Sequence, residues 1–170
     1  VIEIGCGTGI LGIIASMHCD ITSIVFTDAN FHSLEICQDN YVRNISSQSA
    51  VIASYRQLVW GYESTLKFMS NSPDIKFDVV IGCELMYYNT DVFEIISTVS
   101  TILSSCEIPL FLHAHVFRGL EQESELQEGL HQIGWKSLEI PVGLFIDEQD
   151  LAFHPEWYKV RCLLSAPEAI

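Results

Sequence analysis

Positive charge is scarce in this 170-residue chain. Lys and Arg number 8 against 22 Asp and Glu, which gives a formal net charge of −14 and an isoelectric point near 4.5. Surfaces that bind the phosphates of nucleic acids are built from clustered Lys and Arg, and the few basic residues here are scattered along the chain. This composition argues against a nucleic-acid partner and favours a basic substrate or a neutral cofactor.

Three further features are missing. The six cysteines form no CxxC pair, which favours free thiols in a reducing compartment over a disulfide framework or a zinc site. No apolar run approaches the roughly 20 residues of a membrane span. Intrinsic disorder is excluded, because apolar residues make up 49% and charged residues only 18% of the chain. We therefore expect a globular protein without a metal site.

Strand-like and helix-like patterns alternate along the chain. The expected strands are residues 1–4, 24–26, 51–53, 77–81, 108–114, 135–142 and 157–164, and the expected helices are 10–17, 31–44, 91–103 and 120–133. Alternation of this kind predicts an α/β fold, with a mostly parallel sheet covered by helices on both faces. The last two strands are joined by a loop alone, so we expect an antiparallel pairing at the end of the chain.

We expect one domain over residues 1–170, because no linker or repeat divides the sequence. Val1 already belongs to the first expected strand, which suggests that an N-terminal element is missing. His113 and His115 alternate along the fifth expected strand and should share one of its faces. We expect them to be core or cleft residues with satisfied hydrogen bonds.

A glycine-rich turn follows the first expected strand. Gly5, Gly7 and Gly9 stand at alternate positions directly before a predicted helix. Glycine permits positive φ and close approach of a ligand to the backbone, and the helix N-terminus offers unpaired N–H donors. Two cofactor interpretations compete. Gly7, Gly9 and Gly12 match the GxGxxG dinucleotide fingerprint, with Asp28 where a ribose-binding carboxylate belongs.

The pattern E-x-G-x-G-x-G, beginning at Glu3, instead resembles motif I of the seven-strand S-adenosylmethionine (SAM) methyltransferases. Asp28 suits this cofactor equally, since both cofactors present a ribose diol. The expected reversed last strand favours SAM over a nicotinamide cofactor, because the resembled fold has a reversed seventh strand. The expected fold is thus a Rossmann-like, seven-stranded, mostly parallel sheet with an antiparallel last strand.

A second signature is more specific. Gln57-Leu-Val-Trp-Gly61 precedes Phe77-Asp-Val-Val-Ile-Gly-Cys-Glu-Leu-Met-Tyr87, and this pair resembles the family-16 protein lysine methyltransferases. In that family an Asp/Glu-x-x-Tyr motif closes the fourth strand, and here it reads Glu84-Leu-Met-Tyr87. Residues Glu35–Asn44 also resemble the family's helix after strand two. The resemblance runs from residue 1 to about residue 118.

The resemblance implies roles for ten residues. Glu84 and Tyr87 would be catalytic, with the carboxylate positioning the substrate amine and the aromatic ring forming a pocket wall. The implied cofactor contacts are Glu3, Gly5, Gly7, Gly9, Asp28, Ala29, Trp60 and Cys83. Most relatives carry Asp at the position of Glu84, so the carboxylate of this chain reaches one methylene further.

The sequence therefore predicts a SAM-dependent protein lysine methyltransferase. We expect a monomer that acts on a basic or lysine-presenting protein, in the cytoplasm or the nucleus, without nucleic acid or membrane partners. Methylation of a histidine, an N-terminal amine or a small molecule remains an alternative. So does a non-catalytic binding module with the same fold, and a nicotinamide enzyme is a more remote third.

Overall fold

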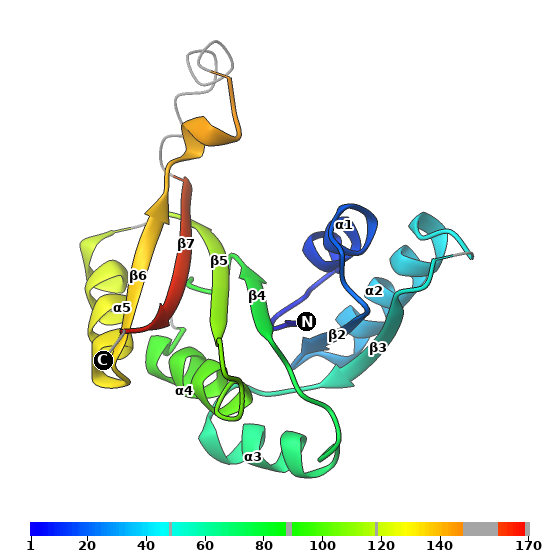
Figure 1. Cartoon of the computed structure of the whole chain (residues 1–170), viewed down its shortest axis with the longest axis horizontal. Coiled ribbons are helices and arrows are strands. Elements are labelled where there is room, and N and C mark those ends of the chain that lie inside the picture. Colours follow the sequence, from blue (N-terminus) through cyan, green and yellow to red (C-terminus); the bar gives the residue numbers. More distant parts are fainter. Residues whose placement is uncertain (48, 88–89, 118, 148–159, 169–170) are drawn as a thin grey trace.

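The computed structural model describes residues 1–47, 49–87, 90–117, 119–147 and 160–168. Strands and helices alternate through them (Figure 1). The strands are β1 (Ile2–Glu3), β2 (Ser23–Asp28), β3 (Ile52–Gln57), β4 (Val79–Cys83), β5 (Leu110–Val116), β6 (Trp135–Ile140) and β7 (Val160–Pro167). The helices are α1 (Ile10–His18), α2 (Phe31–Asn44), α3 (Tyr62–Ser70), α4 (Val92–Ile102), α5 (Leu120–Gln132) and the short η1 (Val142–Leu144).

All seven strands join one sheet in the order β3-β2-β1-β4-β5-β7-β6. The first five strands pair with one another in parallel, whereas β7 runs antiparallel to both β5 and β6. The predicted fold class is thereby confirmed, including the reversed last strand. That strand lies inside the sheet, between β5 and β6, so the edge strand is β6.

Helices cover the two faces of the sheet because side chains alternate along each strand. On β2, Ile24 and Phe26 pack with residues of α1 and α2, while Val25 between them belongs to the core under α4 and α5. On β4 the same alternation sends Val80 to the α4 layer and Ile81 to the α1 and α2 layer. The two cores are thus separated by the sheet itself.

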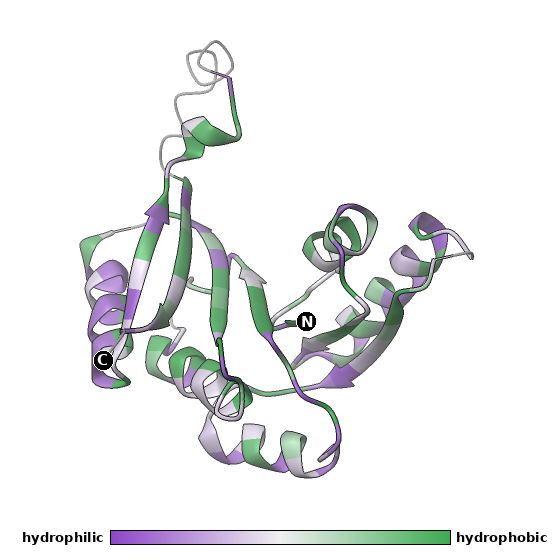
Figure 2. Cartoon of the chain, in the orientation of Figure 1, coloured by the Kyte–Doolittle hydropathy of each residue, from purple (hydrophilic) through white to green (hydrophobic). Residues whose placement is uncertain are grey.

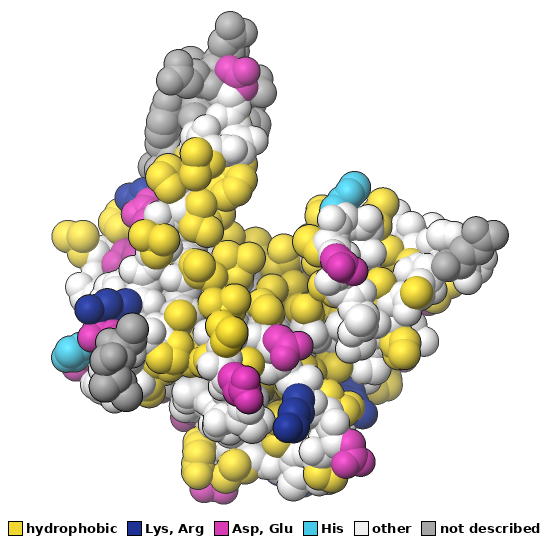
Figure 3. Space-filling model, in the orientation of Figure 1, with side chains coloured by type: hydrophobic (Ala, Val, Ile, Leu, Met, Phe, Trp, Pro, Cys, Tyr) yellow, Lys and Arg dark blue, Asp and Glu magenta, His cyan; other side chains and the backbone are white. Residues whose placement is uncertain are grey.

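One part of the α1 face carries exposed apolar side chains. The register places Ile81, Leu112, Leu164 and Leu138 in a row across β4, β5, β7 and β6, and Leu138 is 65% exposed. Figures 2 and 3 show apolar residues along these strands and on the neighbouring helix. That helix is α1, whose apolar residues Ile10, Ile14 and Met17 are exposed.

The main element missed by the sequence analysis is α3. Its buried residues are Thr65 and Phe68, so the segment lacks the repeating apolar positions that indicate an amphipathic helix. The third strand is also longer than predicted, because its polar residues up to Gln57 continue to pair with β2. Both errors arise where pairing and packing, rather than apolar periodicity, stabilise the element. The predicted residues 157–159 of the last strand lie outside the described residues.

The two histidines of β5 do share one face, as predicted. His113 stacks between the rings of Phe111 and His115, and His115 Nε2 lies 2.6 Å from a carboxylate oxygen of Glu123. The other part of the expectation was wrong: Nε2 of His113 and Nδ1 of His115 are buried with no hydrogen-bond partner among the described residues. Burial lowers the pKa of His113 to about 3, so this ring is neutral at physiological pH.

The six cysteines are free thiols, in agreement with the composition. Cys6 and Cys37 are buried between the glycine turn and α2, and Cys19 and Cys83 are exposed.

Candidate functional site

The glycine turn between β1 and α1 has the left-handed backbone that its sequence predicts. Gly5, Gly7 and Gly9 have φ values of +61°, +52° and +83°. A side chain at Gly9 would overlap the thiol of Cys37, whereas a Cβ at Gly7 would have no atom within 4 Å. Gly9 is therefore needed for packing against α2, and Gly7 leaves the backbone open to an approaching group.

Glu3 stabilises the start of the helix that follows this turn. One of its carboxylate oxygens accepts a hydrogen bond from the Gly12 N–H at 2.9 Å, one of the N–H groups in the first turn of α1 that has no partner within the helix. The side chain is buried, and burial raises its pKa to about 8. The structure thus places the Glu3 carboxylate against the start of α1.

Asp28 ties the end of β2 to the same turn. One carboxylate oxygen accepts from the Gly7 N–H at 2.9 Å, and the other accepts from the Asn30 N–H at 2.8 Å. A carboxylate offers about four acceptor positions, so these two bonds orient Asp28 and leave acceptor capacity for a ligand. The next residue, Ala29, is held by its carbonyl, which accepts from the Gln57 amide at 2.7 Å.

A cavity of about 360 Å³ opens beside Asp28, at the carboxyl ends of the strands. It brings together five residues that the sequence analysis selected and four that it did not select as site residues. The lining residues are Gly5, Asp28, Ala29, Val59, Trp60, Tyr87, Thr90, Asp91 and Glu94. None of them is basic, so the cavity combines two aromatic side chains with three carboxylates and suits a ligand that is cationic or rich in hydrogen-bond donors.

Trp60 forms a wall of this cavity against the glycine turn. A Cβ added to Gly5 would lie 2.8 Å from the indole Cζ2, so only glycine leaves room for the ring there. The backbone that follows Trp60 is tied to α4, because the Gly61 N–H donates to the Thr98 hydroxyl at 2.8 Å. The φ of Gly61 is +121°, and a Cβ there would lie 2.6 Å from a carboxylate oxygen of Glu94.

Asp91 and Glu94 come from the start of α4. Asp91 stands directly before α4 and caps it, because its carboxylate accepts from the N–H groups of Phe93 and Glu94. Their position in the cavity could not be predicted, because it depends on how α4 packs beside the segment that contains Trp60 and Gly61. Neither residue belongs to a recognisable cofactor motif.

Glu84 has an unusual backbone at the end of β4. It is the only residue other than glycine with positive φ in the described chain, at +55°. Its N–H donates to the Ala114 carbonyl at 2.8 Å, and its carboxylate accepts from the Val116 N–H at 2.5 Å. Backbone conformations of this kind are costly for residues with a Cβ and persist where surrounding structure holds them. The two bonds to β5 supply that support.

Of the other predicted residues near β4, one lines the cavity and two do not. Tyr87 is 52% exposed and lines the cavity. Cys83 is exposed and Glu84 half-buried, and neither contributes to the cavity wall. Partial desolvation and the nearby charge of Glu84 raise the pKa of the Cys83 thiol, which disfavours a thiolate role. Glu3, Gly7 and Gly9 also lie outside the wall and act on the shape of the turn.

The residues present fit S-adenosylmethionine. The oriented Asp28 carboxylate suits the two hydroxyls of a ribose, and the Trp60 indole offers an apolar face to an adenine ring. The open backbone at Gly7 allows close approach at the turn. The acidic lining suits a positively charged sulfonium and an amino group.

Comparisons with known proteins agree with this geometry. A family described as "Lysine methyltransferase" matches residues 1–128, and no curated protein sequence matches the chain. Among solved structures, the chain is similar to the ribosomal protein L11 methylase of Lactobacillus delbrueckii subsp. bulgaricus, with TM-score 0.65 and 15% identity over 99% of this chain and 69% of that one.

Two further structures share the fold. The methyltransferase domain of bacterial CtHen1-C has TM-score 0.66 and 13% identity, over 99% of this chain and 89% of that chain. The magnesium protoporphyrin IX methyltransferase of Synechocystis PCC 6803, with bound SAH, has TM-score 0.60 and 14% identity, over 98% and 73%. Identities this low establish the common fold alone.

Proposed function

The chain belongs to the lysine methyltransferase family, and from this premise we propose that it transfers a methyl group to a lysine side chain of a protein. The enzyme class itself is established by that membership: the protein is a SAM-dependent methyltransferase, as the glycine and Trp-Gly motifs predicted. The lysine substrate is the part that we propose.

The observation that carries the proposal is the single cavity beside the glycine turn. Gly5, Asp28, Ala29 and Trp60 line one wall region, and Tyr87 of the Glu-x-x-Tyr motif lines the same space. Residues implied for the cofactor and a residue implied for the substrate therefore meet at one place. Such proximity is what a group transfer between two bound molecules requires.

S-adenosylmethionine, when bound, supplies an electrophilic methyl group on a sulfonium. The remaining work belongs to the residues of this chain. Asp28 and Trp60 would bind the nucleoside portion, and the Tyr87 ring would bound the channel for an aliphatic side chain that ends in an amine. A lysine is charged at neutral pH, so the amine must lose a proton before it can act as a nucleophile.

We assign the orientation and deprotonation of this amine to Glu84. Its carboxylate is anchored at one oxygen by the Val116 N–H, which limits its motion at the carboxyl end of β4, three residues before Tyr87 in the sequence. A held carboxylate there would orient the amine and accept its proton. The left-handed backbone of Glu84 supports this role, since strained conformations concentrate at functional sites.

The substrate is proposed to be a basic protein, because the net charge of −14 attracts cationic partners. We also propose that the enzyme is a monomer that acts in the cytoplasm or the nucleus. In the part of the chain that the structure describes, no helix has the length and apolar character needed to cross a bilayer.

Labelled methyl transfer tests the proposal. The protein is incubated with S-adenosylmethionine carrying a labelled methyl group and with a cell lysate, and labelled peptides are sequenced by mass spectrometry. We expect label on lysine, with none in a parallel reaction with Glu84→Gln. Label confined to histidine, to N-terminal amines or to small molecules would reject the lysine substrate and identify that nucleophile as the methyl acceptor. Tight binding of the demethylated cofactor without transfer to any acceptor would indicate a binding module.

A further inference from the structure

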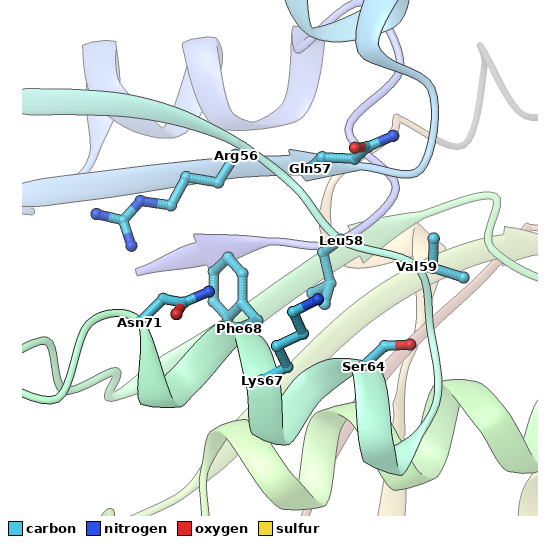
Figure 4. A pocket seen from close by; sticks show the side chains of 8 residues that line it. All are labelled: Arg56, Gln57, Leu58, Val59, Ser64, Lys67, Phe68 and Asn71. Atoms are coloured by element: carbon cyan, nitrogen blue, oxygen red, sulfur yellow. The ribbon is translucent and has the colours of Figure 1, made fainter.

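A second hollow, of about 450 Å³, lies between the end of β3 and α3 (Figure 4). Its wall comes from the end of β3, the residues that follow it and one side of α3. The lining residues are Arg56, Gln57, Leu58, Val59, Ser64, Lys67, Phe68 and Asn71. Val59 alone is shared with the cofactor cavity.

The hollow follows from the packing of α3. Ser64, Lys67, Phe68 and Asn71 are spaced i, i+3, i+4 and i+7, so they lie along one side of the helix. That side carries one buried aromatic residue among polar ones. The helix packs mainly on α4, and its polar side is left facing the edge strand β3. Figure 4 shows the Lys67 side chain rising from α3 towards Leu58.

The lining has the opposite charge to the rest of the molecule. It contains Arg56 and Lys67 and no Asp or Glu, in a chain where acidic residues outnumber basic ones 22 to 8. Within the described part of the chain, neither cation has a carboxylate partner. The Arg56 guanidinium donates to the Ser72 hydroxyl, which uses a minority of its five N–H donors.

The position of Lys67 in the last turn of α3 has an ordinary explanation, since a helix C-terminus favours a cation. That explanation does not extend to Arg56, which comes from a strand, or to the absence of acidic residues from the lining. Leu58 and Phe68 are buried and give the hollow an apolar base, with the polar side chains around them. A concave site with an apolar base and a few convergent polar groups is the usual form of a small-molecule site.

We propose that this hollow is a binding site, separate from the cofactor cavity, for a small organic anion with an apolar body and one phosphate or carboxylate group. The body packs on Leu58 and Phe68, and the anionic group binds the exposed Lys67 amine through a charge-assisted hydrogen bond. Arg56 adds a second positive charge to the lining of the same hollow. Ser64 and Asn71 provide further hydrogen-bonding side chains at the helix side. The acidic surface elsewhere on the molecule repels such a ligand and restricts it to this place.

Binding of phenyl phosphate and of benzoate, measured by calorimetry on the whole chain, tests the proposal. At least one of them should saturate at a single site, and their relative affinity tells a phosphate site from a carboxylate site. Phenol, the uncharged probe, should bind at least about tenfold more weakly, since it lacks the charge-assisted bonds. Saturation by neither anion, or equal binding of phenol, would overturn the proposal.

Variants place the site. Lys67 is exposed, so Lys67→Met should fold normally and weaken the better anion at least about tenfold. Arg56→Gln should weaken it in the same direction. Lys76→Met removes an equal charge outside the hollow and should leave affinity unchanged. Affinity that survives Lys67→Met, or falls equally in Lys76→Met, would show that the anion binds elsewhere.

A last measurement separates the hollow from the cofactor cavity. Binding of the anion is repeated with the demethylated cofactor at saturation, and we expect the site to remain available. Full competition would put the anion in the cofactor cavity and reject a separate site. None of these measurements involves methyl transfer, so their outcome does not depend on the lysine substrate proposed above.

Discussion

The cavity beside Asp28 and the hollow between β3 and α3 both include residues of the connection after β3, and they differ in charge. The first is lined by three carboxylates and two aromatic rings without a basic residue, and the second by two cations without a carboxylate. Val59 belongs to both. Residues of one short connection after an edge strand thus contribute both to an acidic cavity and to a basic hollow. The net charge of the whole chain, here −14, therefore does not predict the sign of the charge in an individual pocket.

The largest expected effect is a loss of methyl transfer that leaves ligand binding at both cavities unchanged. Glu84→Gln keeps the shape of the side chain and an oxygen that can accept from Val116, but it removes the charge. Methyl transfer should fall at least about 100-fold, because a carboxylate that handles a proton is lost. Calorimetry should show unchanged affinity for the demethylated cofactor and for phenyl phosphate. A parallel loss of cofactor affinity would contradict the division between Glu84 and the cavity wall.

Asp28→Ala should weaken the demethylated cofactor by about 30-fold, since hydrogen bonds to a charged acceptor are lost. The anion affinity of the hollow should not change, which sharpens the contrast between the two sites. Asp20→Ala, an exposed acidic residue in the loop after α1, is the control for net charge. Equal weakening in both variants would assign the effect to overall electrostatics.

A third prediction concerns the core away from both hollows. His113 has its pKa lowered by burial to about 3, so the folded state binds a proton less readily than the unfolded state, whose value is near 6.5. Stability is therefore complete above about pH 6.5 and is lost as the pH falls towards 3, by up to about 1.4 kcal/mol per pH unit.

His113→Phe should remove this slope while keeping a ring beside Phe111. Denaturant unfolding at a series of pH values measures it, with His18→Gln, an exposed histidine, as control. An identical acid slope in His113→Phe and in the unaltered protein would reject the assignment. Cofactor and anion affinities at pH 7 should be unaffected, since His113 lines neither hollow.

The smallest effect is expected at the shared wall. Val59 is 55% exposed, so Val59→Ala should reduce binding at both hollows by only about threefold. The two calorimetric titrations already described measure it. A large effect on one ligand and none on the other would show that the side chain belongs to one site alone.

Much of the architecture was predictable because it depends on local patterns. The glycine turn, the α2 helix and the Asp91 cap are each specified by neighbouring residues, and the structure contains all three. The helix α3 was missed because its polar face, with Ser64, Lys67 and Asn71, packs against no core. The exposure of apolar residues on α1 could not be predicted either, because apolar periodicity indicates a helix but not which face another element covers.

The candidate site divides in the same way. Asp28 and Gly5 could be recognised because their motif requires a carboxylate and a left-handed turn at fixed spacing. Asp91 and Glu94 could not, since they enter the cavity through the packing of α4 beside Trp60 and Gly61. The anchoring of Glu84 by the end of β5 joins residues 32 positions apart, a contact that no local pattern encodes.

By itself, the sequence determined the alternation of strands and helices, the left-handed glycine turn after the first strand and the family of the enzyme. These depend on backbone preferences and side-chain periodicity within a few neighbouring residues. Only the tertiary structure decided which carboxylates meet in one cavity, that the backbone of Glu84 is left-handed, and that Arg56 and Lys67 line a single hollow. The physical reason is that charge and exposure at a site depend on distances between elements, which parallel strand pairing and helix packing set together.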